Sequence, residues 1–255
     1  MAPINAAVGL GPYFLESTKF CALVRFRLGR PLVEEPSLCK ICGKAESDVY
    51  GIHSVACIGM GVRTHVHNDI RDAVWRLAVE AQISAKRELS PWESRGRPDI
   101  HIRYGRQVFA IDATVVSPFV AHVESAASRT GGAAAERAAD NKHAKYRVAV
   151  ASGSATLVPL AADVLGAWCV EGLKLVKRLA AAWGRRFDIH PCQAIPLTCT
   201  RLTALLMDGI GNILLANCGQ TPKVPIPKKV DTAEGNAIAT DDSASDSSHH
   251  LTDAE

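Results

Sequence analysis

The sequence predicts a compact α/β domain over residues 63–218, preceded by a small segment ordered by a metal ion. Two strand-like runs, at about 99–104 and 107–116, lie among segments whose apolar residues recur with helical spacing. A third run, at 156–165, completes a predicted order of helix, strand, strand, helix, strand, helix, helix. Such an order is typical of an α/β fold. The upstream segment contains cysteines and a histidine at ligand spacing but few large apolar residues.

The composition is that of an ordinary globular protein, with 255 residues of which 47% are hydrophobic and 22% charged. We expect neither a membrane span nor a signal peptide, because no long uncharged apolar run occurs and the N-terminus lacks a basic region before an apolar one. The predicted location is therefore nuclear or cytoplasmic. Residues 221–255 hold three lysines against seven acids, so the other 220 residues carry a net charge near +7, which suits a polyanionic partner.

The lead-in segment, residues 1–38, contains a predicted helix at 17–28. Its apolar stripe recurs at i, i+3, i+4 and i+8 and consists of Phe20, Leu23, Val24 and Leu28. A second helix is predicted from Asn68, a plausible N-cap, to about Lys86. The acidic, Ser- and Asp-rich tail at 219–255 is predicted to be disordered.

Within the α/β domain, the run 107–116 alternates strictly. One face carries only apolar side chains and should pack inward: Phe109, Ile111, Ala113 and Val115. A helix is predicted at 133–147. The segment 156–165 is predicted to be a strand that runs into a turn, and Pro159 indicates either an edge strand or an interruption. The predicted helices at about 168–183 and 199–216 follow. The basic residues of 168–186 suit either a DNA backbone or solvent: Lys174, Lys177, Arg178, Arg185 and Arg186.

The segment 39–62 has the spacing of a zinc knuckle. Its four candidate ligands are Cys39, Cys42, His53 and Cys57. Four protein ligands leave no open position on the metal, so the predicted role is structural or in nucleic-acid contact. The alternative is a set of unrelated core cysteines and a surface histidine. The other cysteines lack ligand spacing and are predicted to be buried thiols: Cys21, Cys169, Cys192, Cys199 and Cys218.

Two acidic residues lie at matching places on the neighbouring strand-like runs. Asp99 follows a proline at the start of the first run, and Asp112 lies within the second, on the face opposite its apolar side chains. In a hairpin both carboxylates would meet at one end and could bind Mg²⁺ or Mn²⁺ for phosphodiester hydrolysis. Ordinary ion pairs place aspartates in the same way, so this pattern alone leaves both interpretations open.

The motifs, taken in order, resemble the C-terminal region of non-LTR retrotransposon polyproteins, which carries a CCHC zinc knuckle and a restriction-enzyme-like endonuclease. The similar segments are the lead-in LVRFRLGRPL (23–32), the CCHC spacing, RTHVHND (63–69), RPDI (97–100), VFAIDATVV (108–116) and KHAKY (142–146). Val66 stands where the family motif has its second arginine, and Thr114 stands where many nucleases of this fold have a lysine.

The resemblance implies a PD-(D/E)XK fold, with a small mixed sheet flanked by helices and the catalytic lysine moved onto the following helix. It implies that Asp99 and Asp112 hold catalytic Mg²⁺ or Mn²⁺, and that Lys142 and Lys145 assist the reaction. It further implies nucleic-acid contacts by the following residues: Arg63, His67, Asn68, Arg97 and Tyr146. The alternative for Lys142 is a solvated helix lysine.

Three functions remain open from the sequence alone. The first is a DNA endonuclease module, with structural Zn²⁺ and catalytic Mg²⁺, that nicks target DNA. The second is a catalytically inactive remnant that binds nucleic acid, which could be RNA as well as DNA. The third is a zinc-stabilised adaptor that binds protein. The sequence contains no polymerase segment, so the resemblance leads us to expect a free-standing nuclease module or a truncated relic.

Overall fold

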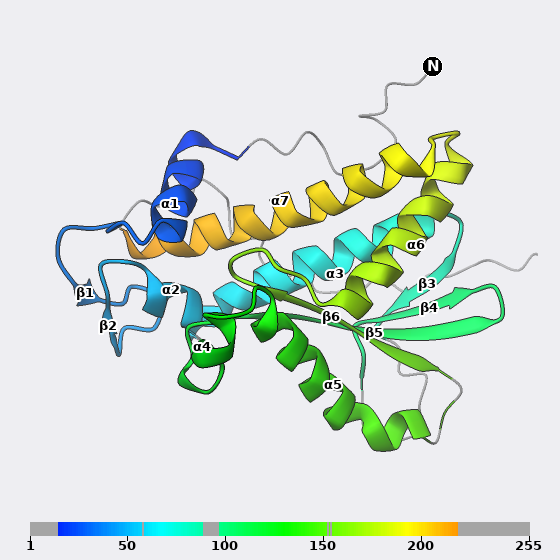
Figure 1. Ribbon diagram of the computed structural model, residues 1–255, viewed down its shortest axis with the longest axis horizontal. Helices are drawn as coiled ribbons and strands as arrows, with labels where there is room; N and C mark the ends of the chain where they lie inside the picture. Colours follow the sequence, from blue (N-terminus) through cyan, green and yellow to red (C-terminus); the bar gives the residue numbers. More distant parts are fainter. Residues whose placement is uncertain (1–14, 58, 89–96, 152, 154, 219–255) are drawn as a thin grey trace, which may run out of the picture. The chain divides into compact units, whose positions relative to one another are not determined.

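The computed structural model describes the whole chain except residues 1–14, 58, 89–96, 152, 154 and 219–255 (Figure 1). The predicted disordered tail at 219–255 therefore lies outside the described residues. The elements are, in chain order, α1 Ser17–Arg27, β1 Ser37–Leu38, β2 Glu46–Ser47, α2 Ile52–Ala56, the short 3₁₀ helix η1 Gly59–Gly61, α3 Val62–Glu80, β3 Ser84–Arg87, β4 Ile100–Tyr104, β5 Gln107–Val116, α4 Ala121–Ala127, α5 Ala133–Ala151, β6 Thr156–Asp163, α6 Val170–Arg186 and α7 Pro191–Asn217.

The central sheet has the strand order β3-β4-β5-β6. The predicted hairpin is confirmed: β4 and β5 pair antiparallel and turn at Gly105, whose φ of 62° favours glycine. Strand β6 runs parallel to β5, after the crossover through α4 and α5, so the sheet is mixed. Pro159 lies on β6, an edge strand, where its missing N–H costs no ladder hydrogen bond on the open side.

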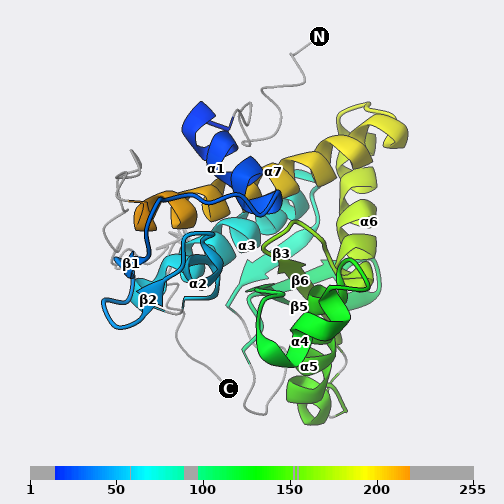
Figure 2. The ribbon, with the colours of Figure 1, turned by 60° about the vertical axis from the view of Figure 1, so that its left-hand side comes forward.

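Helices cover both faces of this sheet (Figures 1 and 2). The predicted inward face of β5 is confirmed, because Phe109, Ile111, Ala113 and Val115 join the main core with residues of α3, α6 and α7. The other face packs against α5, where Ala110 of β5 contacts a small cluster built around Tyr146. Asp112 lies on this second face, under α5. The prediction of an α/β chain with a small mixed sheet flanked by helices is thus correct.

Several element boundaries differ from the predictions, and three of these differences are the largest. Helix α3 begins at Val62, six residues before the predicted N-cap Asn68, and its own N-cap is Gly61 with φ 65°. Strand β3 occupies residues predicted to end that helix, because SAKR carries too little apolar pattern to reveal an edge strand. Helix α7 begins at Pro191, where a proline in the first turn is compatible with helix.

Helix α1 is where predicted, but it buries a different face. The stripe residues Phe20 and Leu28 are 55% and 69% exposed, whereas Phe26 and Lys19 are buried. The Lys19 ammonium lies 2.6 Å from the Asp208 carboxylate on α7. Its stem passes so close to Gly211 that a Cβ there would lie 3.0 Å from Lys19 Cβ. This close approach to α7, invisible in the sequence of α1 alone, sets the buried face.

By length and composition, α7 is the one helix among the described residues that could cross a membrane. Half of its most apolar window is buried inside the protein. It packs against α1, α3 and α6, and its buried residues include Leu206, Ile210 and Leu214. The apolar character of α7 is therefore explained by its place in the core, and it is weak evidence for a membrane.

The cysteine-rich segment shares its core with the rest of the described chain. Cys39, Ile41 and Val55 belong to the same hydrophobic cluster as Leu214 of α7. The side chain of Asn217, at the end of α7, accepts from the Lys40 N–H at 2.9 Å and donates to the Ser54 hydroxyl at 2.6 Å. The last turn of the last helix therefore holds the knuckle in place.

Candidate functional site

Asp99 and Asp112 lie at the same end of the β4–β5 hairpin. The Asp99 N–H donates to the carbonyl of Ile111, the residue before Asp112, at 2.9 Å. Asp112 is only 4% exposed, and Asp99 is half-buried. A buried carboxylate needs a cation or hydrogen-bond donors beside it.

Helix α5 supplies those cations through Lys142 and Lys145. The Lys142 Nζ donates to Asp112 Oδ1 at 2.5 Å, and the Lys145 Nζ lies 3.8 Å from Asp112 Oδ2. The two lysines are three residues apart on α5, so they project from the same side of the helix. The structure thus brings together four of the residues that the resemblance marked as catalytic.

Tyr146 neighbours these lysines but does not face solvent. Its ring is buried, with only 1% of the residue exposed, among Ala110, Ala149 and Leu157. Its hydroxyl donates to the Arg97 carbonyl at 3.3 Å and accepts from Lys145 at 3.1 Å. Burial and the nearby Asp112 carboxylate raise its pKa well above the usual range. The nucleic-acid contact expected of Tyr146 stays a prediction, and in the structure its hydroxyl lies between the Arg97 carbonyl and Lys145.

His67 approaches Asp99 from α3. Its Nε2 lies 3.2 Å from Asp99 Oδ1, while Asp99 Oδ2 accepts from the Ala113 N–H at 2.7 Å. Burial opposes ionisation of Asp99, but the His67 and Ala113 hydrogen bonds and the charge of Lys142 outweigh it and lower the pKa of this carboxyl. His67, expected to bind nucleic acid, is thus placed where it orients a candidate metal ligand.

Three other residues that were expected to contact nucleic acid lie apart from one another. The Arg63 guanidinium donates to the Val115 carbonyl at the end of β5. Arg97 is exposed and pairs with the Glu88 carboxylate at 2.7 Å. The Asn68 side chain makes no hydrogen bond or ion pair with any residue that the structure describes. These three residues therefore do not converge on the two acids.

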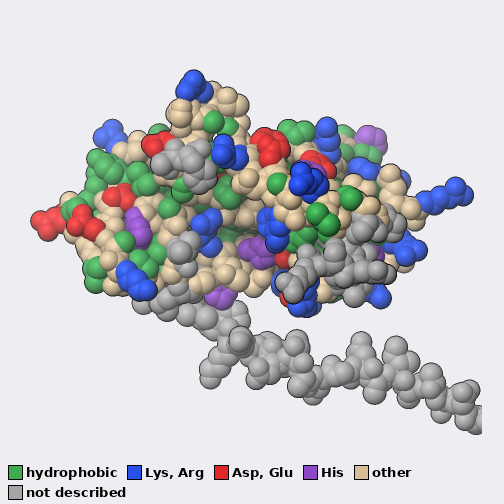
Figure 3. All heavy atoms as spheres, turned by 90° about the horizontal axis from the view of Figure 1, so that it is seen from below, with side chains coloured by type: hydrophobic (Ala, Val, Ile, Leu, Met, Phe, Trp, Pro, Cys, Tyr) green, Lys and Arg blue, Asp and Glu red, His purple; other side chains and the backbone are tan. Residues whose placement is uncertain are grey.

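The basic residues of α6 lie over the opposite face of the sheet. Arg178 stacks over the rings of Tyr104 and Phe109, and Arg185 donates to the Tyr104 hydroxyl at 3.0 Å. Tyr104 and Phe109 belong to the face that points away from Asp112. Figure 3, the view from below Figure 1, shows Lys and Arg side chains (blue) at several places on that side of the molecule.

Carboxylate oxygens are the ligands that Mg²⁺ and Mn²⁺ prefer, and Asp99 and Asp112 offer such oxygens. Among the described residues, Lys142 pairs with Asp112 and His67 contacts Asp99. The donor chemistry of the two acids would suit such a metal.

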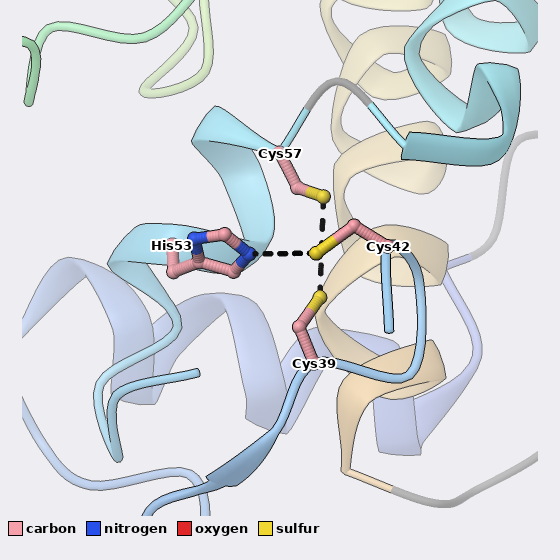
Figure 4. Close-up of side chains that lie close together, drawn as sticks. All are labelled: Cys39, Cys42, His53 and Cys57. Carbon is pink, nitrogen blue, oxygen red and sulfur yellow. Dashed lines mark hydrogen bonds between the residues drawn. The ribbon is translucent and has the colours of Figure 1, made fainter. Parts of the chain in front are cut away.

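The Cys39, Cys42, His53 and Cys57 side chains point toward a common centre (Figure 4). Their ligand atoms all lie within 4.8 Å of one another. The Cys39 and Cys57 sulfurs are 3.9 Å apart, and the Cys42 sulfur is 3.6 Å from His53 Nε2. Tetrahedral zinc with ordinary bond lengths requires separations of about 3.8 Å and about 3.6 Å for such pairs. The predicted cluster is confirmed as a site that could bind zinc.

Backbone N–H groups beside the cluster favour the thiolate form of Cys42, which is the form that binds a metal. The N–H groups of Lys44 and Ala45 donate to the Cys42 sulfur and lower its pKa to about 6. A thiolate is the form that binds metal, so this ligand is largely pre-formed at neutral pH. Burial and the neighbouring thiols instead raise the pKa of Cys57 to about 11, so zinc binding would release its proton.

The remaining cysteines only partly match their prediction. Cys169 is buried, where its thiol donates to the Pro159 carbonyl at 3.3 Å, but Cys21 and Cys192 are exposed. Cys21 is exposed because α1 buries a different face from the predicted one, and Cys192 lies in the open first turn of α7.

No protein-family model matches this chain, and no curated protein matches it either. The motifs and the geometry therefore carry the interpretation. They show an α/β chain with a small mixed sheet flanked by helices and a Cys/His cluster that could hold zinc.

Proposed function

We propose that the chain is a metal-dependent DNA endonuclease module that nicks DNA by phosphodiester hydrolysis. One observation carries this proposal: Lys142 of α5 pairs with Asp112 at 2.5 Å, and its charge also acts on Asp99, so residues from three segments of the chain lie close together at one end of the hairpin. An antiparallel hairpin that carries two acids, followed by a lysine-bearing helix and a parallel strand, fits the PD-(D/E)XK fold of non-LTR retrotransposon endonucleases. The zinc cluster would then be structural, with its exposed lysines available to nucleic acid.

In this proposal each side chain of the site has a separate role. Asp99 and Asp112 hold Mg²⁺ or Mn²⁺, which when bound polarises the phosphate and activates water. His67 keeps Asp99 ionised and oriented through the 3.2 Å contact. Lys142 stabilises the charge that develops on the phosphate, because a preorganised cation in a buried site is effective there. Lys145, which is 59% exposed, binds the substrate phosphate from the solvent side.

The test is nicking of supercoiled plasmid by the purified chain in Mg²⁺ or Mn²⁺. Asp112→Asn should slow nicking by more than about 100-fold, since an interaction specific to the transition state is lost. Asp188→Asn is the matched control, because Asp188 is exposed between α6 and α7 and its φ of 55° is one that asparagine tolerates. Absence of nicking by the unmodified chain with either metal would refute the proposal.

A catalytically inactive nucleic-acid-binding remnant is the second candidate. The observation that favours it is that both acids already have partners within the chain, Lys142 for Asp112 and His67 for Asp99, as in a purely structural network. The same assay separates the two, because a remnant would retain affinity for DNA or RNA without cleaving it. A chain that neither cleaves nor binds nucleic acid would instead support the protein-binding adaptor.

A further inference from the structure

A pocket with both polar and apolar lining lies at the carboxyl end of β5. It has a volume of about 190 Å³ and opens between the start of α3, α4 and α5. Its polar lining comes from Arg63, Ser117, Arg137 and Asn141, and its apolar lining includes Val116 and Ala138. No motif in the sequence marked Arg137 or Asn141.

The charge of this pocket is positive and unbalanced. Two guanidinium groups line it, and no acidic side chain is among its described lining residues. Neither Arg63 nor Arg137 forms an ion pair with an acid in the described part of the chain. Arg63 is half-buried, and its guanidinium is anchored by donation to the Val115 carbonyl, which leaves its other N–H groups for a ligand. A partly desolvated guanidinium without a counter-charge favours an anion.

The pocket continues the face on which Asp112 lies. Val116 and Asp112 are four residues apart on β5, so their side chains point the same way and are about 13 Å apart along the strand. Asn141 directly precedes Lys142 on α5. Basic side chains lie on this side of the molecule (Figure 3). A chain of phosphates that has one member at Lys142 would therefore pass the pocket.

The size of the pocket restricts its ligand. A volume of about 190 Å³ holds about six waters and is smaller than an ordinary small-molecule site. The lining offers two guanidinium groups for one phosphate and the apolar side chains of Val116 and Ala138 for its sugar. Phosphate on arginine and sugar on apolar side chains is the chemistry of a nucleic-acid backbone.

We propose that the pocket of Arg63, Arg137 and Asn141 binds a backbone phosphate of the DNA strand, at a fixed distance from the phosphate that is cut. This subsite rests on the proposed nuclease function. Arg137 supplies a charged two-pronged contact and Asn141 a neutral donor, while Arg63 closes the inner end. The contact positions the strand and carries no sequence information of its own.

The first test compares Arg137→Ala with Arg106→Ala in binding to a fluorescent DNA duplex, without added Mg²⁺ or Mn²⁺. Arg106 is exposed in the β4–β5 turn, at the opposite end of β5, so it is a charge-matched control. Arg137→Ala should weaken binding by about 5- to 10-fold and reduce the salt dependence by about one phosphate contact. The control should change affinity by less than about twofold. Equal effects of the two variants would overturn the proposal.

The second test locates the contact on the DNA. Each phosphate of one strand is replaced in turn by an uncharged methylphosphonate. One replacement should weaken binding to the unmodified chain yet have no effect on Arg137→Ala, because the partner of that phosphate is gone. If every replacement weakens the binding of both proteins by the same factor, the subsite is refuted.

Failure of the subsite and failure of the nuclease are distinguishable. Metal-dependent nicking with a parallel methylphosphonate scan refutes only the subsite. A phosphate coupled to Arg137 in a chain that never nicks DNA upholds the pocket and refutes the nuclease. Thermal unfolding of Arg137→Ala, whose replaced side chain is exposed, should match that of the unmodified chain and so exclude misfolding.

Discussion

Asp112 is a buried carboxylate that lies against the lysines of α5. Taking a charge out of water is unfavourable unless a partner lies beside it, and Lys142 at 2.5 Å is that partner. The side chain of Lys142 is itself partly exposed, so solvent moderates the attraction. The pair therefore contributes to stability mainly by preventing an unpaired buried charge.

Lys142→Met should lower the free energy of unfolding by about 2–3 kcal/mol, because it removes the nearer of the two lysines beside the buried Asp112. Urea denaturation followed by circular dichroism measures this. Lys174→Met removes an exposed lysine of α6 and should change stability by less than about 0.5 kcal/mol. Equal losses in both variants would show that the Asp112 pair has no special role.

Asp99 should make stability depend on acid pH. Its pKa lies below the ordinary value of 3.8 in the folded protein, so its contribution is fully present above about 3.8 and is lost as the pH falls through the folded-state pKa. The stability difference between the unmodified chain and Asp99→Asn should therefore shrink as the pH falls from about 5 to about 3. Urea denaturation across this range is the measurement, and a pH-independent difference would contradict the lowered pKa of Asp99.

The elements differ in how far the sequence predicts them. The hairpin and its inward face follow from a strict two-residue alternation in β5, which leaves only one face apolar. The buried face of α1 does not, because both Phe20 and Phe26 offer an apolar surface and the approach to α7 decides between them. Val66, where the resemblance predicts an arginine, is 3% exposed and packs at Gly209 of α7, so helix packing determines that position.

Gly59 lies where an added side chain would disturb the candidate zinc cluster. A Cβ at this position would lie 2.7 Å from Cys42 Cβ and 2.8 Å from Cys42 Cα, so the backbone of a metal ligand would have to move. Gly59→Ala should therefore weaken zinc binding by about 10-fold or more, measured by competition with a chromogenic chelator. Gly131→Ala is the control, since nothing lies within 4 Å of a Cβ there. Unchanged zinc affinity in Gly59→Ala would contradict the arrangement of the cluster.

At the scale of the whole molecule, the zinc cluster and the sheet domain should unfold together. The cluster shares its hydrophobic core with α7, and Asn217 joins the end of that helix to Lys40 and Ser54. Cys42→Ser should abolish zinc binding and lower the single melting temperature by about 10 °C or more. Cys21→Ser, at an exposed thiol outside the cluster, should leave it unchanged. Two calorimetric transitions in the zinc-bound chain would show that the parts are independent.

The sequence predicts the parts of the site that depend on local spacing better than the parts that depend on contacts between distant segments. The zinc ligands are close in the chain, so their spacing is sufficient to identify them. Asp99, Asp112 and Lys142 require the resemblance as well, because a helix and a hairpin must meet for them to converge. The contact of His67 with Asp99 and the pocket at Arg137 depend on how α3 and α5 pack against the sheet, which no local pattern encodes.

The most direct test of the central claim is the rate at which Asp99→Asn, Asp112→Asn and the double variant nick plasmid in Mn²⁺. If the two acids hold one metal, each single variant should lose nearly all activity and the double variant should lose no more, because the groups act as a unit. Nicking at an unreduced rate by either single variant would show that the two aspartates are not the catalytic centre.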